Sequence, residues 1–238
     1  MNFEVPLVRG RLTRRYNRFL ADVTLDTGEE VVAHCPNPGA MLGLKDPGLP
    51  VWLEPNDDPR RKLRYGWRLV ELEGGNWAGI DASLPNRVVR EALEAGHIPE
   101  LASYSGIRAE VKYGQRSRVD FLLTEPGLPQ TYVEVKNVHL RRTDDWAEFP
   151  DSVTTRGARH MEELAAMVAA GHRSVLVYLV QRTDCRRFRL AGDIDPAYAK
   201  ACREAHDAGV QILCHGTKIG TDGIDMADAI EVHLDPAS

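Results

Sequence analysis

The chain has 238 residues, of which 43% are hydrophobic and 27% are charged, and these proportions exclude a largely disordered protein. No apolar run reaches the length of about 18 residues that a membrane span needs, so we expect no membrane partner. The net charge of −5 does not exclude a nucleic-acid partner. Residues 219–238 carry five acids and no Lys or Arg, which leaves 30 basic and 30 acidic side chains in residues 1–218.

The first 83 residues show short strand-like segments separated by turn residues. The expected strands cover residues 19–25, 31–34, 51–53, 69–72 and 77–80. Five strands in so short a segment predict an OB-like β-barrel domain over residues 1–83. Such barrels bind nucleic acids or oligosaccharides, and the architecture alone does not decide between these ligands.

Two clusters of basic residues lie within this barrel segment. The first has aromatic residues interleaved and no acid, and consists of Arg9, Arg11, Arg14, Arg15 and Arg18 with Tyr16 and Phe19. The second consists of Arg60, Arg61, Lys62 and Arg64. Such clusters are typical of surfaces that meet phosphates through the cations and bases through the aromatic rings. The alternative interpretation is a solvated strand face.

A second domain is expected over residues 84–238. The spacing predicts a helix from Pro85 to about Gly96, strands over 107–113, 118–123 and 131–138, a helix over 152–170 and a strand over 174–180. Another helix over 196–208 and a strand over 210–214 follow. This order predicts a mixed α/β fold in which helices flank a central mixed sheet.

Candidate catalytic residues fall on two of these strands. Alternation sends Val133 and Val135 to one face, so Glu134 and Lys136 emerge side by side on the other. Asp120 lies among apolar residues, where an unpaired charge is costly unless a cation compensates it. Because neighbouring strands lie about 4.8 Å apart, Asp120 and Glu134 can bind one hard divalent ion.

This pattern predicts a Mg²⁺ or Mn²⁺ site, since the oxygen ligands come without a Cys or His pair. Lys136 is expected to position or activate the attacking water in phosphodiester hydrolysis. The alternative is a surface pair of Glu134 and Lys136, with Asp120 capping a turn. Glu91 on the preceding helix is a candidate third ligand, or else a solvated partner of Arg87. Glu110 is more typical of an ion pair with Arg108 or Lys112.

Arg156 and His160 are four residues apart on the expected helix over 152–170, so they share one face. Together with Arg159 they are candidates for contacts with the backbone phosphates of a substrate. The alternative interpretation of His160 is a structural, buried histidine.

The sequence also resembles a known family, the sugar fermentation stimulation protein A family of bacteria and archaea. The resemblance spans nearly the whole chain. It rests on the segments Arg15–Val23, His34–Met41, Leu84–Arg87, Ser117–Leu123, Val133–Val138 and Phe149–His160.

The resemblance implies a DNA-binding protein with an OB-like amino-terminal domain and a carboxyl-terminal domain of the PD-(D/E)xK nuclease superfamily. In that superfamily's pattern the helix acid falls on Glu91, the first strand acid on Asp120, and the Glu-x-Lys pair on Glu134 and Lys136. We therefore assign Asp120, Glu134, Lys136 and Glu91 as catalytic, with the three acids as metal ligands. The residues assigned to DNA binding are Arg14, Arg15, Arg18, Asn37, Arg118, Arg156 and His160.

Three functions follow as alternatives. The first is a Mg²⁺- or Mn²⁺-dependent DNA nuclease without a small-molecule cofactor. The second is a largely nonspecific DNA-binding regulator of sugar (maltose) metabolism genes that keeps the nuclease fold without turnover. The third, an oligosaccharide-binding barrel, rests on fold analogy alone. Four scattered cysteines and no leader-like amino terminus predict reduced thiols and a cytoplasmic protein.

Overall fold

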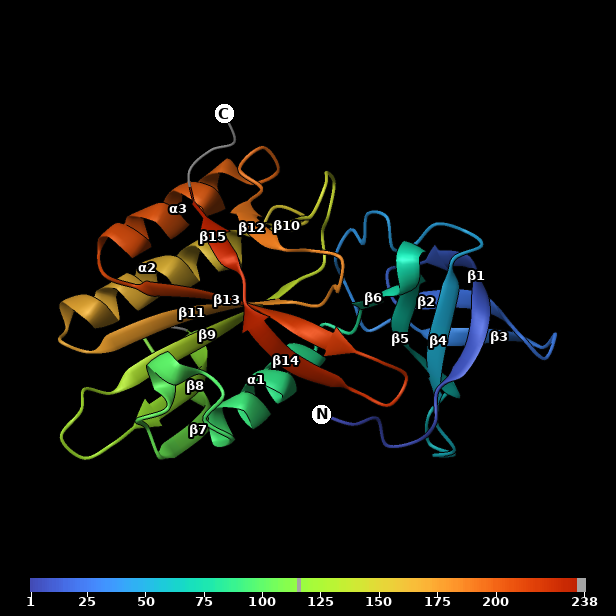
Figure 1. The fold of residues 1–238 in the computed structure, drawn as a ribbon, viewed down its shortest axis with the longest axis horizontal. Helices are drawn as coiled ribbons and strands as arrows, with labels where there is room; N and C mark the ends of the chain where they lie inside the picture. Colours follow the sequence, from blue (N-terminus) through green and yellow to red (C-terminus); the bar gives the residue numbers. More distant parts are fainter. Residues whose placement is uncertain (115–116, 235–238) are drawn as a thin grey trace.

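The computed structural model describes residues 1–114 and 117–234. Residues 115–116 and 235–238, which belong to the predicted carboxyl-terminal domain, lie outside this description. A strand barrel built from the first 80 residues stands beside a larger unit of sheet and helices (Figure 1). No helix among the described residues has the length and apolar character that crossing a bilayer requires.

The amino-terminal unit is a closed, OB-like barrel. Its strands are β1 (Val8–Tyr16), β2 (Leu20–Leu25), β3 (Glu30–His34), β4 (Pro50–Pro55), β5 (Tyr65–Leu72) and β6 (Asn76–Gly79). They are ordered β3-β2-β1-β4-β5-β6, and a further pairing of β3 with β5 closes the barrel. The predicted fold of this segment is confirmed.

β1 is the barrel strand that the sequence pattern did not predict. Its inward positions include Gly10 and Leu12, while Arg9 and Arg11 alternate with them, so no apolar run marks the strand. A side chain at Gly10 would come within 2.7 Å of the Thr24 carbonyl oxygen and of Val23 Cγ1. Only glycine therefore allows β1 to approach β2 this closely.

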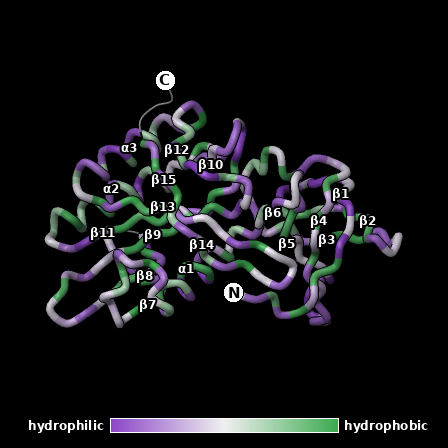
Figure 2. The backbone as a smooth tube through the Cα atoms, in the orientation of Figure 1, coloured by the Kyte–Doolittle hydropathy of each residue, from purple (hydrophilic) through white to green (hydrophobic). Residues whose placement is uncertain are grey.

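The carboxyl-terminal unit is built on a six-stranded mixed sheet with the order β14-β13-β11-β9-β8-β7. These strands are β7 (Gly106–Tyr113), β8 (Ser117–Thr124), β9 (Thr131–Val138), β11 (Arg173–Val180), β13 (Gln211–Ile219) and β14 (Ile224–Ala229). The central strands β9, β11 and β13 are parallel, and such strands are hydrophobic because both of their faces are covered. β11 is buried over nearly its whole length, and Figure 2 shows the hydrophobic stretches that recur in these strands.

Helices cover both faces of this sheet. The helices are α1 (Leu84–Glu94), α2 (Thr155–Ala169) and α3 (Pro196–Asp207). Val88 and Val89 of α1 share one core with Val133 and Val135 of β9. α2 and α3 share a second core with β8, β9 and β11 on the opposite face. The expectation of a mixed sheet flanked by helices is confirmed.

A second, three-stranded sheet was not predicted. It consists of β10 (Trp146–Phe149), β12 (Arg187–Leu190) and β15 (Glu231–His233). Each strand has only three or four residues, and arginines and acids break its hydrophobic pattern. Two short 3₁₀ helices, η1 (Glu73–Gly75) and η2 (Pro99–Leu101), complete the described elements.

Backbone hydrogen bonds join the two units. The amide of Gly79 in β6 donates to the Gln181 carbonyl at 2.9 Å, and the amide of Thr183 donates to the Trp77 carbonyl at 3.0 Å. The segment after β11 therefore runs alongside the last barrel strand. The barrel is thereby held beside the carboxyl ends of the parallel strands.

Candidate active site

A fork between β8 and β9 brings Asp120 and Glu134 together. The antiparallel pairing of these strands runs from Leu123 opposite Thr131 to Phe121 opposite Val133. Asp120 and Glu134 are the next positions along each strand. There the Asp120 carboxylate accepts the Val135 amide through Oδ2 at 2.7 Å, a bond that takes the place of a ladder bond between the strands. Asp120 is therefore held at the point where the strands separate.

The environment of Asp120 disfavours its charge. Burial raises the pKa of Asp120, and the nearby negative charge of Glu134 raises it further. Asn86 of α1 donates to Asp120 Oδ1 through Nδ2 at 2.8 Å, which partly offsets this effect. The Glu134 carboxylate thus disfavours the charge of Asp120, and a cation bound beside Asp120 would offset that effect.

Glu134 and Lys136 lie on the face of β9 that is opposite to the α1 core. Glu134 is only 4% exposed, and its Oε1 accepts from the Lys136 ammonium at 2.7 Å. Its other oxygen, Oε2, is buried and has no hydrogen-bond partner among the described residues. A buried carboxylate oxygen without a donor is costly, so this atom is suited to a ligand.

His160 of α2 is the second partner of Glu134. Its Nδ1 hydrogen-bonds Glu134 Oε1, and its Nε2 accepts from Arg156 Nε at 3.2 Å. Because Nε2 accepts, Nδ1 carries the proton and donates to the carboxylate. Burial by itself would raise the pKa of Glu134, but the His160 hydrogen bond and the Lys136 charge together lower it below its ordinary value.

His160 is 3% exposed and both of its ring nitrogens are engaged, whereas Arg156 is exposed. This geometry favours the interpretation of His160 as a buried histidine that orients Glu134. The predicted phosphate contact of His160 stays a prediction.

Glu91 contacts partners outside this cluster, although it shares α1 with Asn86. Its carboxylate lies 3.4 Å from Arg87 Nε and 2.8 Å from the Met1 amino group. The α1 side chain that contacts Asp120 is Asn86, which the analysis of the sequence did not select. Asn86 lies in the Leu84–Arg87 segment, one of the segments that carry the family resemblance, and this segment is the sequence signal for it.

The basic residues of the β1–β2 hairpin have different surroundings. Arg14 is exposed, lies 2.6 Å from an Asp22 oxygen and covers the Tyr16 ring. Arg18 is exposed at the turn. Arg15 instead donates to the carbonyl oxygens of Asn37 at 2.7 Å and of Gly39 at 3.2 Å. Arg15 therefore holds the loop after β3.

The loop of residues 36–41 connects the barrel to the candidate site. Asn37 is 2% exposed and donates to the Ile80 carbonyl at 2.7 Å, so its side chain supports the loop from within. Arg118, by contrast, is exposed on β8 opposite Lys112. The predicted DNA contacts of Asn37 and Arg118 stay predictions.

Asp151, just before α2, binds this loop from the other domain. It accepts the Ala40 amide at 2.8 Å and the Met41 amide at 3.4 Å, and lies 3.3 Å from His139 Nε2. Burial by itself would raise the pKa of Asp151, but the nearby His139 and the Met41 amide lower it to about 2. This carboxylate therefore acts as a charged latch between the barrel and the segment that leads to His160.

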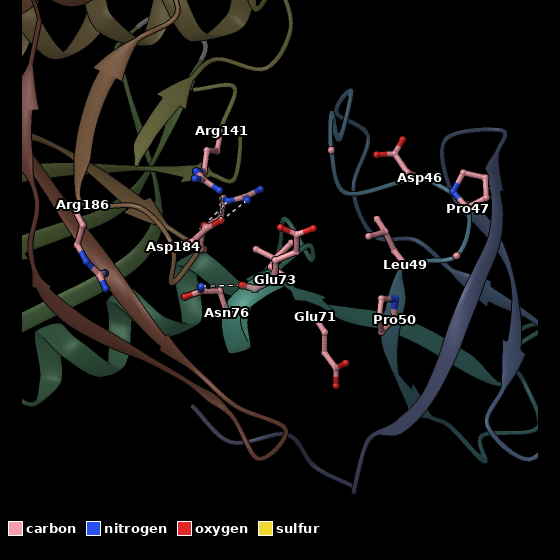
Figure 3. A pocket seen from close by; sticks show the side chains of 15 residues that line it. Asp46, Pro47, Leu49, Pro50, Glu71, Glu73, Asn76, Arg141, Asp184 and Arg186 are labelled. Carbon is pink, nitrogen blue, oxygen red and sulfur yellow. Dashed lines mark hydrogen bonds and ion pairs between the residues drawn. The ribbon is translucent and has the colours of Figure 1, made fainter. Parts of the chain in front are cut away.

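A cleft of about 1120 Å³ lies between the two units, away from Asp120 and Glu134 (Figure 3). On the side of the cleft that faces the carboxyl-terminal unit, Asp184 forms ion pairs with Arg141 at 2.8 Å and with Arg182 at 2.7 Å. Glu71 and Glu73 line the side of the cleft that belongs to the barrel. Because acids balance these arginines, the cleft lacks the excess of positive charge that phosphate binding requires.

Comparison with known proteins identifies the family. The family profile described as the sugar fermentation stimulation protein RE domain matches residues 83–223, and that of the SfsA N-terminal OB domain matches residues 13–80. The chain belongs to the sugar fermentation stimulation protein family. The resemblance drawn from the sequence motifs is confirmed.

Similar relatives match the chain over its whole length. The sugar fermentation stimulation protein homolog of Dinoroseobacter shibae is 69% identical and covers 100% of this chain and 97% of its own. The homolog of Jannaschia sp. is 61% identical, over 99% and 98%. The solved structure of Pyrococcus furiosus SfsA, described as a complex with Ca²⁺, is 28% identical, with a TM-score of 0.87 over 98% of each chain.

Proposed function

We propose that the protein is a Mg²⁺- or Mn²⁺-dependent DNA nuclease of the PD-(D/E)xK type, centred on Asp120, Glu134 and Lys136, and that it acts in the cytoplasm. The observation that carries the proposal is the fork, where two carboxylates and an ammonium meet and one buried carboxylate oxygen lacks a donor among the residues that the structure describes. All four cysteines are free and buried, in keeping with a reducing compartment.

The donor set suits a hard divalent ion that is held mainly by water and substrate. Asp120 and Glu134 supply two carboxylates, and Mg²⁺ commonly takes one or two from the protein. Across residues 1–114 and 117–234, no three His, Cys, Asp or Glu side chains are placed to hold a metal. Glu91 would need to leave Arg87 and the Met1 amino group to join them. The Ca²⁺ described for the Pyrococcus furiosus protein supports an ion with oxygen ligands.

The side chains around the fork have separate roles in this proposal. A bound divalent ion would supply charge neutralisation at the phosphate and would lower the pKa of a water molecule. Lys136 is placed to orient the attacking water and to stabilise the developing negative charge. His160 holds Glu134 in one orientation, and Asn86 does the same for Asp120.

The test is a cleavage assay of the purified protein on single-stranded, duplex and branched DNA, with Mg²⁺, Mn²⁺ or EDTA. We expect cleavage of at least one DNA form with metal and none with EDTA. Absence of cleavage of all three forms with either metal would reject the nuclease proposal.

The second candidate is a DNA-binding regulator of sugar metabolism genes without turnover. Exposed Arg14, Arg18, Arg61 and Lys62 on the barrel favour a DNA-binding surface. The name of the relatives, which records stimulation of sugar fermentation, agrees with a regulatory effect. DNA binding with no cleavage in the same assay would favour this candidate.

A further inference from the structure

The barrel exposes an aromatic pair formed by Phe19, at the β1–β2 turn, and His34, at the end of β3. Phe19 is 46% exposed and follows a turn in which both Asn17 and Arg18 have positive φ. Its ring stacks on His34 of β3, with centroids 6.5 Å apart and planes inclined by 23°. A flat aromatic surface open to solvent is a platform on which a nucleobase can stack.

A basic pocket adjoins this pair. It has a volume of about 280 Å³, and His34, Asn56, Arg61, Lys62, Tyr65 and Arg68 contribute to its lining. Arg61 and Lys62 are exposed on the loop between β4 and β5. Among the described residues that line the pocket, the one acid is Glu54, and Arg68 binds it at 2.6 Å. Arg61 and Lys62 therefore leave a positive charge that complements phosphates.

Hydrogen bonds connect this pocket to the candidate active site. Arg68, in the lining, contacts the buried Asp81, which accepts the Ser83 amide at 2.8 Å at the start of α1. Gln181 donates to the Asp81 carbonyl at 3.2 Å and to Asn137, the neighbour of Lys136, at 2.9 Å. Arg68, Asp81, Gln181 and Asn137 therefore form a chain of contacts from the pocket to the strand that carries Lys136.

We propose that this face, defined by Phe19, His34, Arg61, Lys62 and Tyr65, binds single-stranded DNA through a stacked, unpaired base and its flanking phosphates. The inference rests on the proposed function in taking DNA as the substrate. In a duplex the flat faces of the bases are covered by their neighbours, so only a single strand can use the aromatic pair. The site thereby favours substrates with an unpaired segment.

The test measures binding of the full-length protein in EDTA, which separates binding from cleavage. The three ligands are a single-stranded oligonucleotide, its abasic counterpart with the same phosphates, and a duplex. Phe19→Ala should weaken single-strand binding by about fivefold or more, the low end for one lost base stack. It should leave abasic and duplex binding unchanged. Phe19→Tyr should bind as wild type does.

Leu128→Ala is the matched control, because Leu128 is 43% exposed on the loop between β8 and β9. It should bind all three ligands as wild type does. An unchanged single-strand affinity in Phe19→Ala, or an equal loss for all three ligands, would overturn the inference. If Phe19→Ala loses the base-dependent binding and the wild type does not cleave DNA, the inference stands and the nuclease proposal is rejected. If the wild type cleaves DNA but Phe19→Ala binds single strands as the wild type does, the nuclease proposal stands and the base-stacking inference is rejected.

Discussion

His160 Nδ1 on α2 donates to Glu134 Oε1 on β9, and this hydrogen bond ties the helix to the candidate centre. The bond leaves Glu134 Oε2 without a donor among the described residues, while Arg156 engages the other ring nitrogen. A histidine in this position fixes the orientation of the carboxylate that the proposed reaction uses.

His160→Ala should therefore reduce single-turnover cleavage by about 10- to 100-fold, the usual effect of losing a residue that orients a metal ligand. DNA affinity in EDTA should not change, because His160 is buried. His160→Asn, whose amide can still donate, should recover part of the rate. A loss of DNA affinity with unchanged chemistry would instead support a phosphate contact.

Divalent metal should stabilise the wild type through Asp120 and Glu134. At a metal concentration of about 100 times Kd the expected gain is about 2.7 kcal/mol, provided that the ion binds only the folded state. For a protein of this size that gain raises Tm by roughly 5–10 °C. Asp120→Asn should lose this response in a thermal unfolding experiment. An equal metal-induced shift in both proteins would contradict a shared site.

Without metal, Asp120→Asn should be at least as stable as wild type at pH 7. Burial and the Glu134 charge raise the pKa of Asp120, so its ionised form disfavours the folded state. The advantage of the variant should shrink as the pH falls and Asp120 takes up a proton. Thermal unfolding of both proteins in EDTA, from pH 7 down to about pH 4, measures the effect. A variant less stable than wild type at every pH would show that the Asp120 charge is already compensated.

The Asp151 latch should make stability depend on acid pH. Its pKa of about 2 lies below the ordinary value of 3.8, so its contribution is present above about pH 4 and is lost as pH falls toward 2. Asp151→Asn should lower the free energy of unfolding at pH 7 by about 2 kcal/mol. Chemical denaturation should find this difference shrinking with acid. A difference that is constant from pH 7 to pH 2 would exclude the charge as its cause.

Among the hairpin arginines, the exposed pair should govern the salt dependence of DNA binding. Replacing Arg14 and Arg18 with Ala should flatten the slope of log affinity against log salt by about one unit per lost phosphate contact. Arg15→Ala should mainly lower thermal stability, because Arg15 bonds to the loop of residues 36–41. If the double variant has the same slope of log affinity against log salt as the wild type, Arg14 and Arg18 do not contact the DNA phosphates.

Local sequence patterns predicted the elements on which the site is built. Two-residue alternation in β9 placed Glu134 and Lys136 on one face, and the contact between them agrees with it. The bonds of Asp120 with Asn86 and of Glu134 with His160 join residues 34 and 26 positions apart. These bonds depend on how the helices pack on the sheet. Periodicity within one element does not contain that information. The bonds of Arg15 with the loop of residues 36–41 have the same origin, and its predicted DNA contact stays a prediction.

Lys136 gives the most direct measurement of the central claim, because its ammonium contacts the carboxylate Glu134 and is assigned to chemistry more than to affinity. Single-turnover cleavage and DNA binding should be measured together for wild type, Lys136→Ala and Asp120→Asn. The account predicts that Lys136→Ala binds DNA nearly as wild type does but cleaves about 10² times more slowly, and that Asp120→Asn does not cleave with metal. Equal cleavage by wild type and Lys136→Ala, or no cleavage by the wild type on any DNA form, would contradict it.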